Sequence, residues 1–407
     1  MIRPHRLEVA DVFRKHADEY LTTYGATTAQ RQVIRAVQNC RTAVLGGHVE
    51  ACDRCGHRHV AYNSCRNRHC PKCQGPATVR WLQAREAELL PVPYFHLVFT
   101  LPAALGPLAL QNPRVVYGLL LQAAAQTLLE VAANPQHLGA EIGFLVVLHT
   151  WGQNLMHHPH VHCVIPAGGL APDGTRWIRS RPKFFLPVRV LSRVFRGKFI
   201  DRLKQALVRG ELTFHGNLAG LARKGAFERL LDQIVRQEWV VYARPPFGGP
   251  KQVLKYLARY THRVAISNPR LISLDNNQVT FRWKDYAKGS RQSLMTLTAV
   301  EFIRRFLLHV LPRGFVKIRH YGFMANRFRQ ANLALCRRLL AVTEASPAVA
   351  ASVALPTGEP PSASASETAC RRCPKCAEGH LWIVERLLPQ IGPSPMIRSV
   401  PINPDTS

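Results

Sequence analysis

Two Cys-x-x-Cys pairs near the N-terminus constrain the fold of this 407-residue chain more than any other feature. Cys52 and Cys55 form the first pair, and Cys70 and Cys73 form the second, with fourteen residues between them. Each such turn presents two thiolates to one ion, so two turns supply the four ligands of a closed tetrahedral zinc site. We therefore predict a zinc ribbon held by these four cysteines, with a structural role because no coordination position is open.

Other potential ligands lie inside the loop and near the C-terminus. A compact group of three cysteines at 370–376, followed by His380, has no second Cys-x-x-Cys pair after it. It is either a remnant or a metal site that borrows a ligand such as Cys336. The residues within the N-terminal loop that could replace a thiolate are Cys65, His57, His59 and His69.

The charge of the chain indicates a polyanionic partner. The 54 Lys and Arg against 25 Asp and Glu give a formal net charge of +29. From Lys251 to Arg338 there are 18 Lys or Arg and three acidic residues. Such a concentration of one sign favours a nucleic-acid-binding face over a merely basic surface.

Nothing in the sequence pattern calls for a membrane. Charged residues are scattered through the first fourteen positions, which argues against a signal peptide. The longest apolar stretch, 115–133, is interrupted by Gln122, Gln126 and Glu130 and is typical of a packed helix. We expect a cytoplasmic protein.

Short β-type runs alternate with longer helical patterns, which predicts an α+β domain with an antiparallel sheet and flanking helices. Strands are expected at 94–100, 144–149, 161–165, 264–267 and 279–283. Helices are expected at 115–133, 193–208, 227–239, 251–260 and 299–311. The predicted divisions are a helical and zinc-binding domain at 1–90, the main domain at 91–344, a flexible linker at 345–369, a cysteine cluster at 370–388 and a Pro-rich tail at 389–407.

A group of histidines opens into one of the predicted strands. His160 and His162 fall on the same face of that strand, because side chains alternate with a period of two. Two imidazoles on one face of a stiff strand form half of a site for a divalent cation.

Two tyrosines lie four residues apart in a predicted helix. Tyr256 and Tyr260 would project from the same face, with Arg259 and Arg263 near enough to contact phosphate. Packing in the core is the alternative role for each tyrosine.

Further downstream, Arg282 and Lys284 are candidate DNA-binding residues. The aromatic residues that could stack on bases, or instead belong to the core, are Trp283, Tyr286, Tyr321 and Phe323.

Together these features resemble the HUH endonucleases, and in particular the two-tyrosine transposases of rolling-circle insertion sequences. The resemblance covers roughly residues 10–340, and its clearest segments are 158–163, 256–268, 281–286 and 319–323. It implies an HUH-type antiparallel sheet preceded by a zinc-binding domain. It also implies that His160 and His162 bind Mg²⁺ or Mn²⁺ and that Tyr256 and Tyr260 are the nucleophiles.

The resemblance further implies binding of single-stranded DNA, transposon ends and target DNA, with cleavage and strand transfer through a 5′-phosphotyrosine. The rival functions are a rolling-circle replication initiator or relaxase, and a non-catalytic zinc-ribbon DNA-binding regulator. The third ligand of the catalytic metal remains open among His149, Gln153, His157 and His262.

Overall fold

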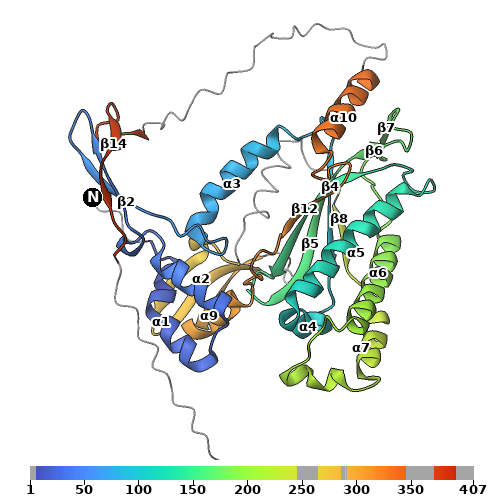
Figure 1. Cartoon of the computed structure of the whole chain (residues 1–407), viewed down its shortest axis with the longest axis horizontal. Helices are drawn as coiled ribbons and strands as arrows, with labels where there is room; N and C mark the ends of the chain where they lie inside the picture. Colours follow the sequence, from blue (N-terminus) through green and yellow to red (C-terminus); the bar gives the residue numbers. More distant parts are fainter. Residues whose placement is uncertain (1–5, 245–264, 286–288, 290, 345–370, 391–407) are drawn as a thin grey trace, which may run out of the picture.

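The computed structural model describes residues 6–244, 265–285, 289, 291–344 and 371–390 (Figure 1). Helices and antiparallel sheets alternate along these ranges, which confirms the predicted α+β class. The expected linker at 345–369 and the expected helix at 251–260 lie outside the described residues. Short 3-10 turns lie at Ala43–Leu45, Ala103–Leu105, Gly216–Ala222 and Asn268–Arg270.

The largest sheet has five antiparallel strands in the order β12-β4-β5-β3-β8. Consecutive strands β4 and β5 form a hairpin, and β5, which carries the histidine group, is paired on both sides. The expected strands at 94–100, 144–149 and 161–165 are confirmed as β3, β4 and β5. The bounds are β3 Tyr94–Thr100, β4 Gly143–Trp151, β5 His157–Pro166, β8 Val241–Arg244 and β12 Ile318–Gly322.

Helices cover one face of this sheet and bury the main core, to which Leu97, Phe99 and Val161 contribute from the strands. Among the described helices, α5 alone is long and apolar enough to cross a membrane, but 67% of its apolar window is buried. The helix is accounted for by core packing, as its polar interruptions predicted. The helices are α4 Gly106–Gln111, α5 Pro113–Ala133, α6 Val188–Val208 and α7 Ala226–Val235.

The opposite face of the sheet is covered in part by α10 (Arg329–Glu344), by α3 (Pro71–Glu86) and by a small hairpin. The hairpin strands are β6 (Gly168–Leu170) and β7 (Trp177–Arg179). A separate core lies here. This is the face on which the paired histidines lie, because His160 and His162 alternate with the core residues of β5.

A second core joins the start of the chain to its later part. Helices from residues 9–39 pack on a three-stranded sheet and a helix from residues 271–307, and Phe13 meets Phe306 with ring centroids 5.2 Å apart. The domains expected at 1–90 and 91–344 therefore share this core. The elements are α1 Val9–Tyr24, α2 Thr28–Asn39, β9 Leu271–Asp275, β10 Gln278–Asp285, β11 Arg291–Thr298 and α9 Ala299–Leu307.

The strand expected at 264–267 is not present in its described part, 265–267. Ala265 and Ile266 are instead buried in the second core as irregular chain before the turn at Asn268–Arg270. A short apolar run predicts burial, but burial against helices and pairing in a sheet give the same pattern.

A small four-stranded sheet brings the two ends of the chain together in the order β13-β14-β1-β2. Strand β14 (His380–Leu387) pairs antiparallel with β1 (Gly47–Cys52), with Cys52 opposite Leu381. The outer strands are β2 (Arg58–Tyr62) and β13 (Arg371–Arg372). Figure 1 shows this sheet at one end of the molecule, away from the five-stranded sheet.

Candidate metal centre and DNA-binding surface

Three histidines gather on the face of the five-stranded sheet that is opposite the main core. His149 on β4 is the cross-strand partner of His160 on β5, and His162 lies two residues further along the same face. Their ligand nitrogens all lie within 4.8 Å of one another. The strand geometry thus brings together the two predicted ligands and one of the four candidates for the third.

One hydrogen bond of His160 determines which of its ring nitrogens can bind a metal. The Nδ1 of His160 donates to the carbonyl oxygen of His158 at 2.7 Å, so its Nε2 can act as a ligand. Burial lowers the pKa of His160 to about 4. The imidazole is therefore neutral near pH 7, which is the form that binds metals.

His96 on β3 supports the cluster and was not anticipated from the sequence. Its Nε2 lies 2.8 Å from Nδ1 of His162, and the two rings are stacked. Burial lowers the pKa of His96 to about 4, so the ring is neutral and its Nε2 can accept a hydrogen bond from the Nδ1–H of His162. That bond selects Nε2 of His162 as the ligand atom.

The other candidate ligands lie elsewhere. His157 is on the opposite face of β5, where its Nε2 lies 2.8 Å from the hydroxyl of Tyr117 on α5. Gln153 lies in the turn of the hairpin, and its carbonyl accepts a hydrogen bond from Arg270 at 2.6 Å. His262 lies outside the described residues.

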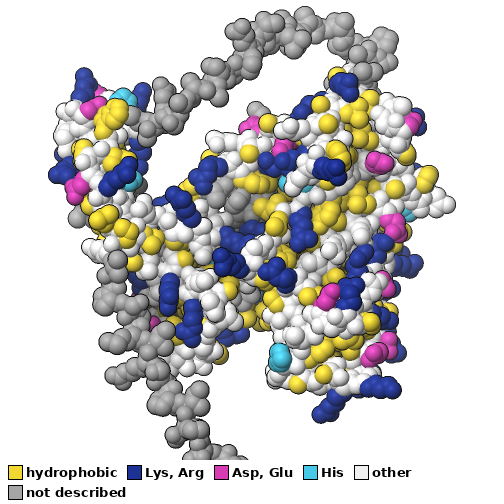
Figure 2. Space-filling view, in the orientation of Figure 1, with side chains coloured by type: hydrophobic (Ala, Val, Ile, Leu, Met, Phe, Trp, Pro, Cys, Tyr) yellow, Lys and Arg dark blue, Asp and Glu magenta, His cyan; other side chains and the backbone are white. Residues whose placement is uncertain are grey.

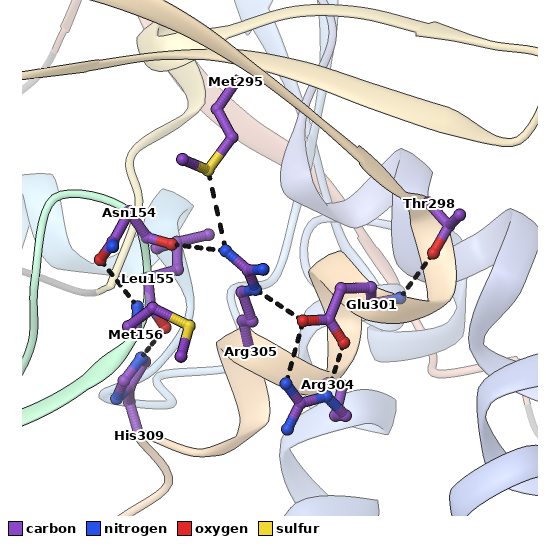
Figure 3. Close-up of polar contacts among 9 residues, drawn as sticks. All are labelled: Asn154, Leu155, Met156, Met295, Thr298, Glu301, Arg304, Arg305 and His309. Atoms are coloured by element: carbon purple, nitrogen blue, oxygen red, sulfur yellow. Dashed lines mark hydrogen bonds and ion pairs between the residues drawn. The ribbon is translucent and has the colours of Figure 1, made fainter.

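The turn that joins the two histidine strands is anchored in the second core (Figure 3). Leu155 is fully buried there, with a φ of 63°. Its carbonyl accepts a hydrogen bond from Nε2 of His309 at 3.0 Å, and the carbonyl of Asn154 accepts one from Arg305 at 3.2 Å. The Nε of Arg305 donates a hydrogen bond to Oε1 of Glu301 at 2.6 Å, which orients the Arg305 side chain. The second core therefore fixes the position of the hairpin that carries His149, His160 and His162.

The cysteines form two groups of four, and the predicted single ribbon is corrected. Cys70 and Cys73, at the start of α3, lie with Cys65 and Cys40, and Cys40 follows the end of α2. The distance from Cys73 Sγ is 3.5 Å to Cys40 Sγ and 3.6 Å to Cys65 Sγ. With Zn–S bonds of 2.3 Å, a tetrahedral site has sulfur atoms about 3.8 Å apart, whereas a disulfide brings them to about 2.0 Å. The geometry thus fits zinc.

Cys52 and Cys55 lie with Cys373 and Cys376 instead of with Cys70 and Cys73. Strand β1 ends at Cys52 and pairs with β14, so the first Cys-x-x-Cys pair lies beside the C-terminal cysteines. The second pair lies with Cys40, which follows the end of α2. Cys336, suggested as a borrowed ligand, is buried in the core beside α10. The loop residues His57, His59 and His69 belong to neither group.

The predicted DNA-binding residues are described in part. Arg282 and Lys284 are exposed on β10, and they alternate with Val279 and Phe281, which are buried in the second core. Figure 2 shows groups of Lys and Arg side chains on the face of the molecule that carries α3 and part of the five-stranded sheet. The residues Tyr256, Tyr260, Arg259 and Arg263 lie outside the described part of the chain.

Three of the four aromatic residues that could stack on bases are described, and each packs against one of the cores. Trp283 packs against the second core, Tyr321 stacks on Phe144, and Phe323 is 5% exposed. Tyr286 is outside the described residues. The basic neighbours of these rings in the sequence do not indicate which way each ring faces, since strand residues alternate between faces.

Two family models match the chain. Residues 143–332, which include the histidine hairpin, match a model described as "Putative transposase". Residues 12–101, which include Cys40 and the two N-terminal Cys-x-x-Cys pairs, match the transposase zinc-binding domain of the IS91 type. The fold, the histidine cluster and these matches define a transposase with a zinc-binding domain.

Two relatives specify the family. The chain is 54% identical over 379 residues to "Putative transposase y4qJ" of Sinorhizobium fredii, covering 93% of this chain and 95% of the relative. It is 30% identical over 306 residues to "Transposase for insertion sequence element IS801" of Pseudomonas savastanoi pv. phaseolicola, covering 74% and 72%. The chain belongs to the IS91/IS801 family, the two-tyrosine HUH transposases of rolling-circle insertion sequences. No solved structure matches it.

Proposed function

We propose that this transposase cleaves and rejoins single-stranded DNA at the ends of a transposable element through a covalent bond to tyrosine. The observation that carries the proposal is the cluster of His149, His160 and His162 on paired strands of an antiparallel sheet. The family membership and the net charge of +29 support DNA as the substrate. We expect the reaction to take place in the cytoplasm, where such DNA is accessible.

The three histidines would hold a divalent cation. When bound, the cation polarises the scissile phosphate and neutralises charge that develops there. All three imidazoles are nitrogen donors, whereas Mg²⁺ prefers oxygen. We therefore propose that Mn²⁺ binds more tightly than Mg²⁺ at this site.

A tyrosine at position 256 or 260 would act as the nucleophile. Its phenolic oxygen loses a proton and forms a bond to phosphorus, and the bond from phosphorus to the 3′ oxygen breaks. That oxygen takes up a proton and leaves as a 3′-hydroxyl, while the 5′-phosphate stays on the tyrosine. The link retains a phosphodiester, so a 3′-hydroxyl can reverse the step and join strands without ATP. A second tyrosine allows another cleavage while the first strand is held.

The test is the formation of a covalent adduct. Purified protein is incubated with labelled single-stranded DNA from the element ends, with and without Mn²⁺ or Mg²⁺. The variants are Tyr256→Phe, Tyr260→Phe and the double variant, with Tyr242→Phe as the control because Tyr242 is an exposed tyrosine on β8. We expect a metal-dependent adduct that the double variant alone loses completely.

Other outcomes would identify the rival functions. Tight binding without an adduct on the correct ends would indicate a non-catalytic zinc-ribbon regulator. An adduct that never leads to joining of an element end to a target strand would favour a replication initiator or a relaxase.

The proposed third ligand is tested separately. His149→Ala and His160→Ala should each weaken Mn²⁺ binding and adduct formation by about tenfold or more. His157→Ala is the matched control, because His157 lies in the same hairpin on the opposite face. Full metal binding in His149→Ala would remove His149 from the ligand set.

A further inference from the structure

We propose that a second structural zinc ion, held by Cys52, Cys55, Cys373 and Cys376, fastens the C-terminal segment to the N-terminal domain. The zinc-binding family match ends at residue 101, and the transposase match ends at residue 332. Half of the proposed ligands therefore lie beyond both matches. The site would be completed by residues more than 300 positions away in the sequence.

The sulfur geometry fits one tetrahedral ion. Cys52 Sγ lies 3.7 Å from Cys376 Sγ, and Cys55 Sγ lies 3.7 Å from Cys373 Sγ, each close to the separation of about 3.8 Å expected in a four-thiolate zinc site. All four sulfur atoms lie within 4.8 Å of one another. A disulfide would require about 2.0 Å.

Backbone N–H groups are arranged to stabilise thiolates. The N–H of Arg54 donates to Cys52 Sγ at 3.4 Å, and the N–H of Lys375 makes the equivalent bond to Cys373 Sγ at 3.4 Å. The N–H of Gly379 donates to Cys376 Sγ at 3.3 Å. Hydrogen bonds to an ionised acceptor are stronger than those to a neutral one, so these bonds favour the deprotonated ligands.

The two Cys-x-x-Cys turns also fit each other closely. A Cβ at Gly379 would lie 2.5 Å from Cys52 Sγ and 2.6 Å from Asp53 Oδ1, so only glycine fits this approach. Asp53 in turn accepts hydrogen bonds from the N–H of His380 at 2.8 Å and from the indole of Trp382 at 3.4 Å. Contacts of this kind hold the second turn against the first.

Hydrophobic packing is too small to hold the segment in place. The buried part of this cluster consists of Cys52, Cys373 and Leu381. On β14, Trp382, Ile383 and Val384 are each 54–55% exposed. The free energy of binding a structural zinc ion becomes part of the free energy of folding, so the ion can order a sheet with so small a core. Binding converts four thiols to thiolates and releases their protons to water.

The first test measures the zinc content of the full chain by mass spectrometry. The double variant Cys373→Ser/Cys376→Ser should lose about one zinc ion per chain relative to the wild type. Cys336→Ser is the control, since Cys336 is buried in a different core, and it should retain the wild-type content. The single variant Cys376→His, with Cys373 intact, should keep the wild-type zinc content, because imidazole can replace a thiolate as a zinc ligand. Unchanged zinc content in the double variant would overturn the proposal.

The second test keeps all four ligands. A specific protease site is inserted within residues 345–369, the chain is cut, and the fragments are passed through a sizing column. We expect the C-terminal fragment to co-elute with the rest in zinc and to separate after chelation. Separation in the presence of zinc would contradict the proposal. Neither test depends on DNA cleavage, so failure here and failure of the proposed function are distinguishable.

Discussion

Leu155 at the tip of the β4–β5 hairpin is the position where stability and the metal site should be coupled. Its side chain is fully buried in the second core. Leu155→Ala removes three carbon atoms, each worth about 0.8 kcal/mol of transfer free energy, or about 2.4 kcal/mol in all. The cavity that remains raises the expected loss of unfolding free energy to about 2.5–5 kcal/mol.

The assay is urea unfolding of zinc-loaded protein, followed by a Mn²⁺ titration of the folded variant. Leu294→Ala is the control, because Leu294 is 64% exposed on β11, and it should change stability by less than about 0.5 kcal/mol. We also expect Leu155→Ala to weaken Mn²⁺ binding, since the turn positions His149 and His160. A loss of unfolding free energy below about 1 kcal/mol would refute the reasoning. So would a larger loss of unfolding free energy that leaves the Mn²⁺ affinity unchanged.

Two further perturbations test the supports of the site. Burial lowers the pKa of His309 to about 3 from an ordinary 6.5, so as the pH falls through this window the unfolded chain gains a proton that the folded chain does not. The free energy of unfolding should therefore fall with decreasing pH. In urea titrations, His309→Gln should reduce the slope of unfolding free energy against pH by about 1.4 kcal/mol per pH unit. The same slope in the variant and the wild type would contradict a neutral, buried His309. Gly322→Ala places a Cβ 1.7 Å from the carbonyl of Ile142 at a φ of +60°. A loss of roughly 3 kcal/mol or more is expected by thermal unfolding, whereas Gly118→Ala, with open space around it in α5, should be neutral or stabilising, and equal effects would rule out the clash.

Local sequence patterns were sufficient to predict the strand that carries His160 and His162. The period of two in a strand predicts that His160 and His162 share a face, and the structure places them together. The third member could not be chosen in the same way. His149 reaches the cluster through the register of β4 against β5, and register depends on the turn and on burial in the second core.

The cysteines show the limit of spacing rules. Two Cys-x-x-Cys pairs separated by a short loop predict one site, but the first pair lies with Cys373 and Cys376, and the second lies with Cys40 and with Cys65, one of the loop residues named as possible ligands. Cys40 belongs to no Cys-x-x-Cys motif. Cys373 and Cys376 lie beside Cys52 because β14 pairs with β1. Such pairing between the chain ends is a tertiary interaction that no local pattern encodes. The placement of Tyr256 and Tyr260 remains a prediction.

The most direct test of the proposed chemistry is the polarity of the covalent link. Single-stranded DNA from an element end is labelled separately on each side of the cleavage point and incubated with the protein and Mn²⁺. We expect the label on the 3′ side of the break to remain on Tyr256 or Tyr260, and the 5′-side fragment to be released with a free 3′-hydroxyl. Retention of the 5′-side label, or an adduct that survives substitution of both tyrosines, would contradict a 5′-phosphotyrosine intermediate.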